Sequence, residues 1–121
     1  MISLEQITDY CMNFAGSTQD FPFDQETMVF KVMEKIFLAV NIAWWMEGIE
    51  KINLKCDPKR ALQLREEYES IIPGYHMNKK HWNTVSVNDG ELSSEQIFEL
   101  IDHSYDLVVK NLPKKDQKLL Q

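Results

Sequence analysis

The chain has 121 residues, of which 44% are hydrophobic and 26% charged, with only 4 Gly and 4 Pro. This length fits one domain, and the composition excludes a disordered or low-complexity chain. The net charge of −6 favours solubility and opposes indiscriminate attraction to nucleic acid or anionic lipid. The charge is uneven, because residues 1–30 hold no Lys or Arg, whereas residues 31–82 hold nine bases and seven acids. An anion-binding surface is therefore expected only in the middle of the chain.

Cysteine usage and hydropathy indicate a reducing compartment. Cys11 and Cys56 are too few for a disulfide framework. The first residues lack a basic segment followed by an apolar one, so no signal peptide is indicated. The most apolar stretch, residues 36–46, has eleven residues, and a membrane span needs about 20. We expect a cytoplasmic protein that does not enter a membrane.

The N-terminal residues predict a helix. Ser3 and Gln6 have the spacing of a capping box, apolar residues follow at helical spacing, and Gly16 suits the C-terminal end. Residues 17–20 are predicted to form a loop. The aromatic segment 21–23 is expected to lead into the sheet in an extended conformation.

Apolar residues then alternate with polar ones, or run together, as in half-buried and buried strands. These patterns predict strands near residues 28–32, 36–42 and 49–56. Because a parallel return would need a crossover of a dozen or more residues, the short links predict an antiparallel meander.

The C-terminal half predicts two further helices around one or two short strands. Asp57-Pro58 is a helix start, with an N-cap acceptor followed by Pro at the first helical position. Ser93 with Gln96 predicts a second capping box, and an apolar stripe runs from there to a stop at Pro113. The strands between these helices are predicted at residues 71–74 and 82–87.

The predicted order is helix, three strands, helix, one or two strands, helix. Helices laid on one face of an antiparallel sheet make a two-layer α+β domain. Residues 1–113 are expected to form this single domain, and residues 114–121 a polar C-terminal tail.

The most distinctive segment is residues 73–82, with the sequence PGYHMNKKHW. On a surface, its lysines, histidines and aromatic rings are what phosphate contact and base stacking need. The structural alternative is that Tyr75 and Trp82 are core aromatics, Asn78 is a turn residue and the lysines are merely solvated.

The sequence indicates neither a metal site nor covalent catalysis. His76 and His81 are five residues apart, which places them on opposite faces of an extended segment, and no H-E-x-x-H or C-x-x-C motif is present. Cys11 lies on an apolar helix stripe. Cys56 alternates with apolar strand residues, although its position before a helix could lower a thiol pKa. We expect a protein without catalytic activity, metal or cofactor.

A second candidate surface follows the second predicted strand, at Trp44-Trp45-Met46. Adjacent strand residues point to opposite faces, so one Trp is predicted to be buried and the other exposed. An exposed Trp beside Met46 would suit a protein partner. The alternative is a hairpin end tucked under a helix.

Several of these segments together resemble the YjbR/MmcQ family of small bacterial proteins. The likeness lies in residues 21–23, 29–32, 35–38, 54–58, 73–82 and 104–108, and the segment 73–82 is the most specific. The resemblance implies an α-β-β-β-α-β-β-α order, which agrees with the order predicted above, in a double-wing fold related to the CyaY-like group, and a DNA-binding function. This chain departs from the family where Glu34 stands, since the family often has Gly there.

The leading hypothesis is therefore a non-catalytic DNA-binding protein that contacts mainly phosphates. About four neutralised phosphates would give a slope of roughly −3.6 in log K against log salt. The predicted contact residues are Lys31, Lys35, Tyr75, His76, Asn78, Lys79, Lys80, His81 and Trp82.

The alternative function is a protein-interaction or chaperone-like module, homodimers included, that uses an apolar sheet face or the surface of Trp44, Trp45 and Met46. A minor alternative is a small-ligand or enzyme site around His76, His81 and Trp82, which would need a concave cavity.

Overall fold

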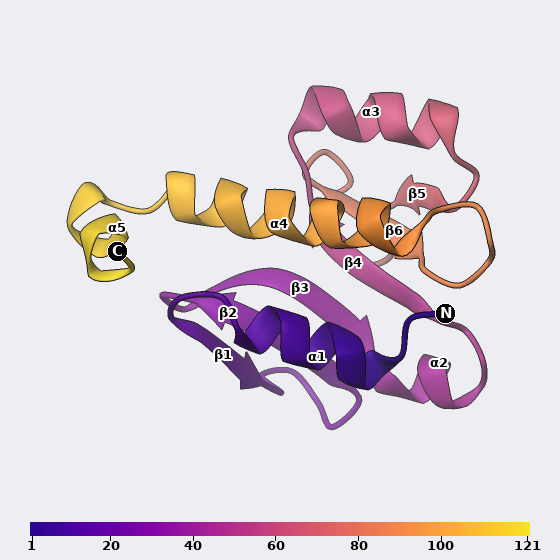
Figure 1. Cartoon of the computed structure of the whole chain (residues 1–121), viewed down its shortest axis with the longest axis horizontal. Coiled ribbons are helices and arrows are strands. Elements are labelled where there is room, and N and C mark those ends of the chain that lie inside the picture. Colours follow the sequence, from indigo (N-terminus) through magenta and orange to yellow (C-terminus); the bar gives the residue numbers. More distant parts are fainter.

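The structure is a computed structural model that describes every residue from Met1 to Gln121 (Figure 1). The elements follow in the order α1 (Leu4–Met12), β1 (Ser17–Asp20), β2 (Thr27–Val32), β3 (Lys35–Asn41), α2 (Ile42–Met46), β4 (Lys51–Lys55), α3 (Pro58–Glu67), β5 (Ile71–Pro73), β6 (Trp82–Ser86), α4 (Ser94–Lys110) and α5 (Lys114–Leu119).

All six strands form one antiparallel sheet in the order β1-β2-β3-β4-β6-β5. The sheet and its helices confirm the predicted α+β class. The strands predicted between residues 28 and 87 are confirmed as β2, β3, β4, β5 and β6.

One face of the sheet carries the main core, because alternate strand residues point to the same side. Figure 1 shows α4 crossing the middle of the molecule, between α1 and α3. These three helices contribute side chains to the same apolar cluster as the strands, so the helices cover one face, as predicted. The fully buried members of this cluster include Ile7, Phe30, Phe37, Leu38, Ile52, Ile71, Ile97 and Ile101.

The helix starts form as predicted. Both capping boxes are present, at Ser3 with Gln6 and at Ser93 with Gln96. The side chain of Asp57 accepts the backbone N–H of Arg60 at 3.1 Å. These contacts satisfy N–H groups that the first helical turn leaves without partners.

The two halves of the sheet meet at a short joint between β3 and β4. Their register holds only two residue pairs, Leu38 with Leu54 and Ala39 with Asn53. Beyond Leu54, the buried hydroxyl of Ser104 on α4 takes the place of a backbone hydrogen bond between the two strands. It accepts the Lys55 N–H at 2.9 Å and donates to the Phe37 carbonyl. The sheet is therefore completed by a helix side chain.

The prediction of a loop at residues 17–20 is wrong, because these residues form β1. They pair with β2 at the edge of the sheet, from Ser17 opposite Val32 to Asp20 opposite Val29. None of the four is buried. An exposed edge strand has no need of alternating apolar residues, so its sequence carried no strand signal.

The tryptophan pair does not continue a strand. Trp44 and Trp45 lie on helix α2, whose N-cap is Asn41, and both are half-buried. The prediction of one buried and one exposed tryptophan is therefore wrong, because strand alternation does not apply on a helix.

The C-terminal residues, expected only to be a polar tail, form α5. After this helix, Leu120 packs against Gly16 and Val32. A Cβ at Gly16 would lie 2.5 Å from the Leu120 side chain, and Gly16 has a φ of +70°. The positive φ therefore favours glycine at this position. No helix of the structure has the length and apolarity to cross a membrane.

Candidate functional site

The distinctive segment forms a loop between β5 and β6 that its own backbone holds in place. The Gly74 N–H donates to the Trp82 carbonyl at 2.9 Å, and the Trp82 N–H donates to the Asn78 carbonyl at 3.0 Å. The Asn78 side chain accepts the Lys80 N–H at 2.9 Å, which makes Asn78 a turn residue. His76 adopts a φ of +59° and is exposed. The loop is therefore an ordered structure.

Helix α3 ties this loop to the sheet through Arg65. Its guanidinium donates to the Asn83 side chain at 2.6 Å and to the carbonyls of Lys79 and Trp82. The Lys79 ammonium donates to the Gly74 carbonyl at 3.1 Å, across the base of the loop. Arg65 therefore serves the loop structure, while the ammonium of Lys80 has no such contact.

The loop also covers part of the sheet face that lies away from the helices. The Tyr75 N–H donates to the Thr84 hydroxyl at 3.0 Å, and this hydroxyl donates to the Asn53 side chain. The Tyr75 ring lies 5.3 Å from the Trp44 ring. The Trp45 indole points elsewhere and donates to the Lys51 carbonyl at 2.9 Å. Tyr75 is half exposed, so it is a surface residue in contact with α2.

A surface cavity of about 460 Å³ lies beyond the joint, at the ends of β3 and β4 where the ladder has stopped. Lys35 comes from the start of β3, and Lys55 and Trp82 from the paired ends of β4 and β6. We call this cavity the joint groove; its lining residues are Glu34, Lys35, Ile36, Lys55, Trp82, Val108, Asn111 and Leu112.

The charges of the joint groove are mostly positive. Neither Lys35 nor Lys55 makes an ion pair, since Lys31 and Arg60 are the only basic side chains that bind a carboxylate in the structure. The Glu34 carboxylate, also at the groove, is bound by the Lys31 ammonium at 3.1 Å. The groove therefore presents two free ammonium groups beside one aromatic ring and one compensated carboxylate.

Lys31 is differently placed from the other predicted contact residues. Its ammonium binds Asp20 at 2.9 Å in addition to Glu34, and its side chain is only 13% exposed. These two carboxylates raise the pKa of Lys31, while the Lys31 ammonium lowers the pKa of Asp20. Lys31 is therefore a counter-ion within the fold.

The structure thus brings Lys35 and Trp82 to one cavity, whereas the other predicted contact residues of the loop lie outside its lining. Lys55 was not among the predicted contact residues. Its alternation with Ile52 and Leu54 placed it on the sheet face away from the core, but only the β4–β6 register shows that it lies beside Trp82.

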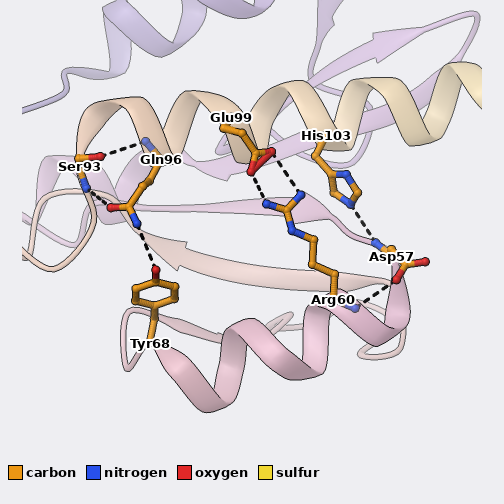
Figure 2. Close-up of polar contacts among 7 residues, drawn as sticks. All are labelled: Asp57, Arg60, Tyr68, Ser93, Gln96, Glu99 and His103. Carbon is orange, nitrogen blue, oxygen red and sulfur yellow. Dashed lines mark hydrogen bonds and ion pairs between the residues drawn. The ribbon is translucent and has the colours of Figure 1, made fainter.

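A second cavity, of about 270 Å³, lies between α3 and α4. Figure 2 shows the polar contacts along this seam. Arg60 forms a bidentate ion pair with Glu99, and Gln96 donates to the Tyr68 hydroxyl at 3.1 Å. Every side chain drawn there has a partner within the protein, so the seam joins two helices.

The seam ends at His103, whose Nε2 accepts the Asp57 N–H at 3.2 Å (Figure 2). Burial, followed by the nearby Arg60 charge, lowers the pKa of His103. Its neighbour Cys56 is buried, which raises the pKa of that thiol to about 11, and burial raises the pKa of Cys11 to about 12. No group of three or more His, Cys, Asp and Glu side chains is placed to hold a metal ion.

These features define a class of small α+β proteins in which one long helix packs on an antiparallel sheet where the two halves of that sheet meet. The YjbR family model matches residues 12–107, and the chain belongs to this family. The resemblance seen in the sequence is therefore confirmed.

Relatives and a solved structure agree with this assignment. The chain is 48% identical to uncharacterized protein YbdF of Escherichia coli O157:H7 over 99 residues, which cover 81% of this chain and 77% of the relative. It is 34% identical to uncharacterized protein YjbR of Escherichia coli strain K12 over 119 residues, 98% of each chain. A crystal structure of a Deinococcus radiodurans protein with a DUF419 domain matches with a TM-score of 0.88 and 38% identity, covering 99% of this chain and 88% of that one.

Proposed function

We propose that this protein binds DNA without catalysis, by contacting phosphates with the joint groove and the adjacent loop. The observation that carries the proposal is that Lys35 and Lys55, from different halves of the sheet, meet at one cavity without a carboxylate partner of their own. Unpaired ammonium groups on a rigid frame are what phosphate contact needs.

Lys79 and Lys80 extend this cationic surface. Both side chains are exposed on the ordered loop that ends at Trp82. We leave Lys31 out of the contact set, because releasing it would uncover Asp20 and Glu34. Lys55 takes its place. The overall charge of −6 opposes a broad electrostatic attraction, so contact is confined to this footprint.

The test is the salt dependence of binding to a labelled duplex, measured by fluorescence anisotropy. Four lysines that each neutralise one phosphate give a slope of about −3.6 in log K against log salt. Replacing one of them, as in Lys55→Gln or Lys80→Gln, is expected to reduce the slope by about 0.9.

Lys51→Gln is the matched control. Lys51 lies on the same strand and the same face as Lys55, about 13 Å along β4, so its removal is expected to change the slope less. Absence of binding at about 50 mM salt, or a signal that salt does not change, contradicts the proposal.

The absence of a catalytic role is part of the same proposal. Burial raises the pKa of both thiols, so neither is a thiolate nucleophile near neutral pH. Both cysteines are also free and buried, which suits the reducing cytoplasm that we propose as its location. Rapid reaction of either thiol with a soluble disulfide reagent in the folded protein would contradict the proposal that neither cysteine is a nucleophile.

A second candidate function is contact with a protein through the end of α2. Met46 is 85% exposed and Ile49 is 40% exposed, close in the chain to the Trp44–Tyr75 ring pair. Exposed apolar side chains that gather in this way mark interaction surfaces. Self-association through them predicts a mass that rises with concentration in light scattering and is restored to the monomer by Met46→Glu.

A further inference from the structure

We infer that the joint groove holds one unpaired base, so that the protein binds single-stranded nucleic acid more tightly than duplex. This inference rests on the proposed function, because it concerns the same site. It follows from the size of the groove, from the position of Trp82 and from the distribution of charge around them.

The groove has the dimensions of a site for a small molecule. Its volume of about 460 Å³ lies within the range of about 300–1,000 Å³ that is usual for ligand cavities. A duplex presents phosphates to such a cavity, but its bases are stacked inside the helix. Only an unpaired base can enter and expose its face to a protein ring.

Trp82 is the ring that such a base would meet. Its backbone is held by hydrogen bonds to Gly74 and Asn78 and by the guanidinium of Arg65. A Cβ at Gly74 would lie 2.8 Å from the Trp82 Cβ and 3.0 Å from the Trp82 carbonyl oxygen, so only glycine allows the loop to pass so close. The backbone that carries the indole is therefore fixed before any ligand arrives, which reduces the entropy that ordering this segment on binding would otherwise cost.

The remaining lining residues complete the chemistry of a nucleotide site. Lys35, at the start of β3, and Lys55, at the end of β4, both line the groove and suit the phosphates next to one base. Ile36 and Leu112 offer apolar contact to a base or sugar. Asn111, at the C-cap of α4, has an amide that can both donate to and accept from a base edge.

The first experiment compares a labelled single-stranded oligonucleotide with its duplex at one salt concentration, by fluorescence anisotropy. We expect the single strand to bind at least tenfold more tightly. An abasic strand of the same length keeps the phosphates and lacks the bases, and we expect it to bind no better than the duplex.

The second experiment places the contact at Trp82. Trp82→Ala is expected to weaken single-strand binding about tenfold, the usual effect of losing one stacked base, and to leave duplex binding unchanged. Trp82→Phe keeps an aromatic face and is expected to retain most of the affinity. Trp44→Ala is the control, because it removes a partly exposed tryptophan that does not line the groove.

A third measurement does not depend on how the Trp82 variants fold. With Trp44 and Trp45 replaced by Phe, Trp82 is the one remaining tryptophan of the three, and its emission should be quenched by the single strand and not by the abasic strand.

The outcomes separate the inference from the proposed function. Equal binding of single strand, abasic strand and duplex would overturn the inference that an unpaired base is bound. So would a Trp82→Ala variant that loses equal affinity for the single strand and for the duplex. Either result would leave the proposed phosphate binding intact. No binding of any of the three overturns both.

Discussion

The joint groove and the α3–α4 seam are both surface cavities with charged walls, but they differ in how those charges are partnered. Along the seam, Arg60 is bound to Glu99, and Gln96 is bound to Tyr68 and Ser93. In the groove, Lys35 and Lys55 have no ion-pair partner. Side chains that satisfy one another hold elements together, whereas ammonium groups left unpaired beside an aromatic ring are available to a ligand. On this ground we propose a structural role for the seam and ligand binding for the groove.

The largest effect is expected at Ser104, whose hydroxyl links α4 to β3 and β4 next to the groove. Ser104→Ala leaves the Phe37 carbonyl and the Lys55 N–H without their partner. Since each buried unpaired group costs about 1–3 kcal/mol, we expect the free energy of unfolding to fall by about 2–6 kcal/mol. Urea denaturation measures this. Ser94→Ala, at an exposed position of α4, should have little effect, and an equal loss in both variants would contradict the role of the joint.

Substitutions at Glu34, which lines the groove, test whether its carboxylate weakens nucleic-acid binding. Met33 and Glu34 have φ values of +49° and +65°. This conformation costs a non-glycine residue about 1–2 kcal/mol. Glycine avoids that cost, but it offsets part of the gain because its backbone loses more conformational entropy on folding. Glu34→Gly should therefore raise the free energy of unfolding by about 1 kcal/mol and also tighten nucleic-acid binding.

The matched variant Glu34→Gln separates these two effects. It removes the carboxylate and keeps the strained backbone, so tighter binding without added stability is expected. Unchanged affinity in both variants would show that the charge of Glu34 does not reach the ligand.

Breaking the seam should affect stability and leave binding unchanged. Arg60→Gln removes the same charge as Lys55→Gln, but it disrupts an ion pair whose two side chains are 33% and 53% exposed. Exposed pairs contribute little, so the expected loss is about 0.5 kcal/mol in urea denaturation. If Arg60→Gln weakens DNA binding as much as Lys55→Gln, then net charge governs affinity and the groove does not.

The smallest effect concerns the pH dependence of the seam. Because burial and the Arg60 charge lower the pKa of His103 in the folded protein, the fold favours the neutral ring. Its contribution to stability is complete above the ordinary pKa of 6.5 and is lost as the pH falls through the lower pKa of the folded state. His103→Gln should remove this part of the decline in stability between pH 7 and pH 5, while His76→Gln should keep it.

Much of the fold was predictable because its signals are local. Ser3 and Ser93 predict helix starts because each has a capping-box partner three residues later. The alternation of Ile52 and Leu54 with polar residues predicts a strand regardless of which strands lie beside it. β1 was missed because Ser17 to Asp20 become a strand only by pairing with β2. Likewise, α5 has no internal apolar stripe and packs through Leu120, which follows it.

The candidate site was only partly predictable. The sequence pointed to the segment 73–82 and to Lys35, and of these Trp82 and Lys35 line the joint groove. It also pointed to Lys31, whose partner Asp20 is eleven positions away in sequence and is brought into contact by strand pairing. Lys55 carried no sign of its position beside Trp82.

The sequence by itself determined the family, the α+β class, the helix ends and a scarcity of positive charge outside residues 31–82, since each depends on residue type and short spacing. Only the tertiary structure decided which of those positive charges are neutralised. Pairing between distant strands sets the distance from each ammonium to each carboxylate, and that distance determines whether a lysine stabilises the fold or remains free for a ligand.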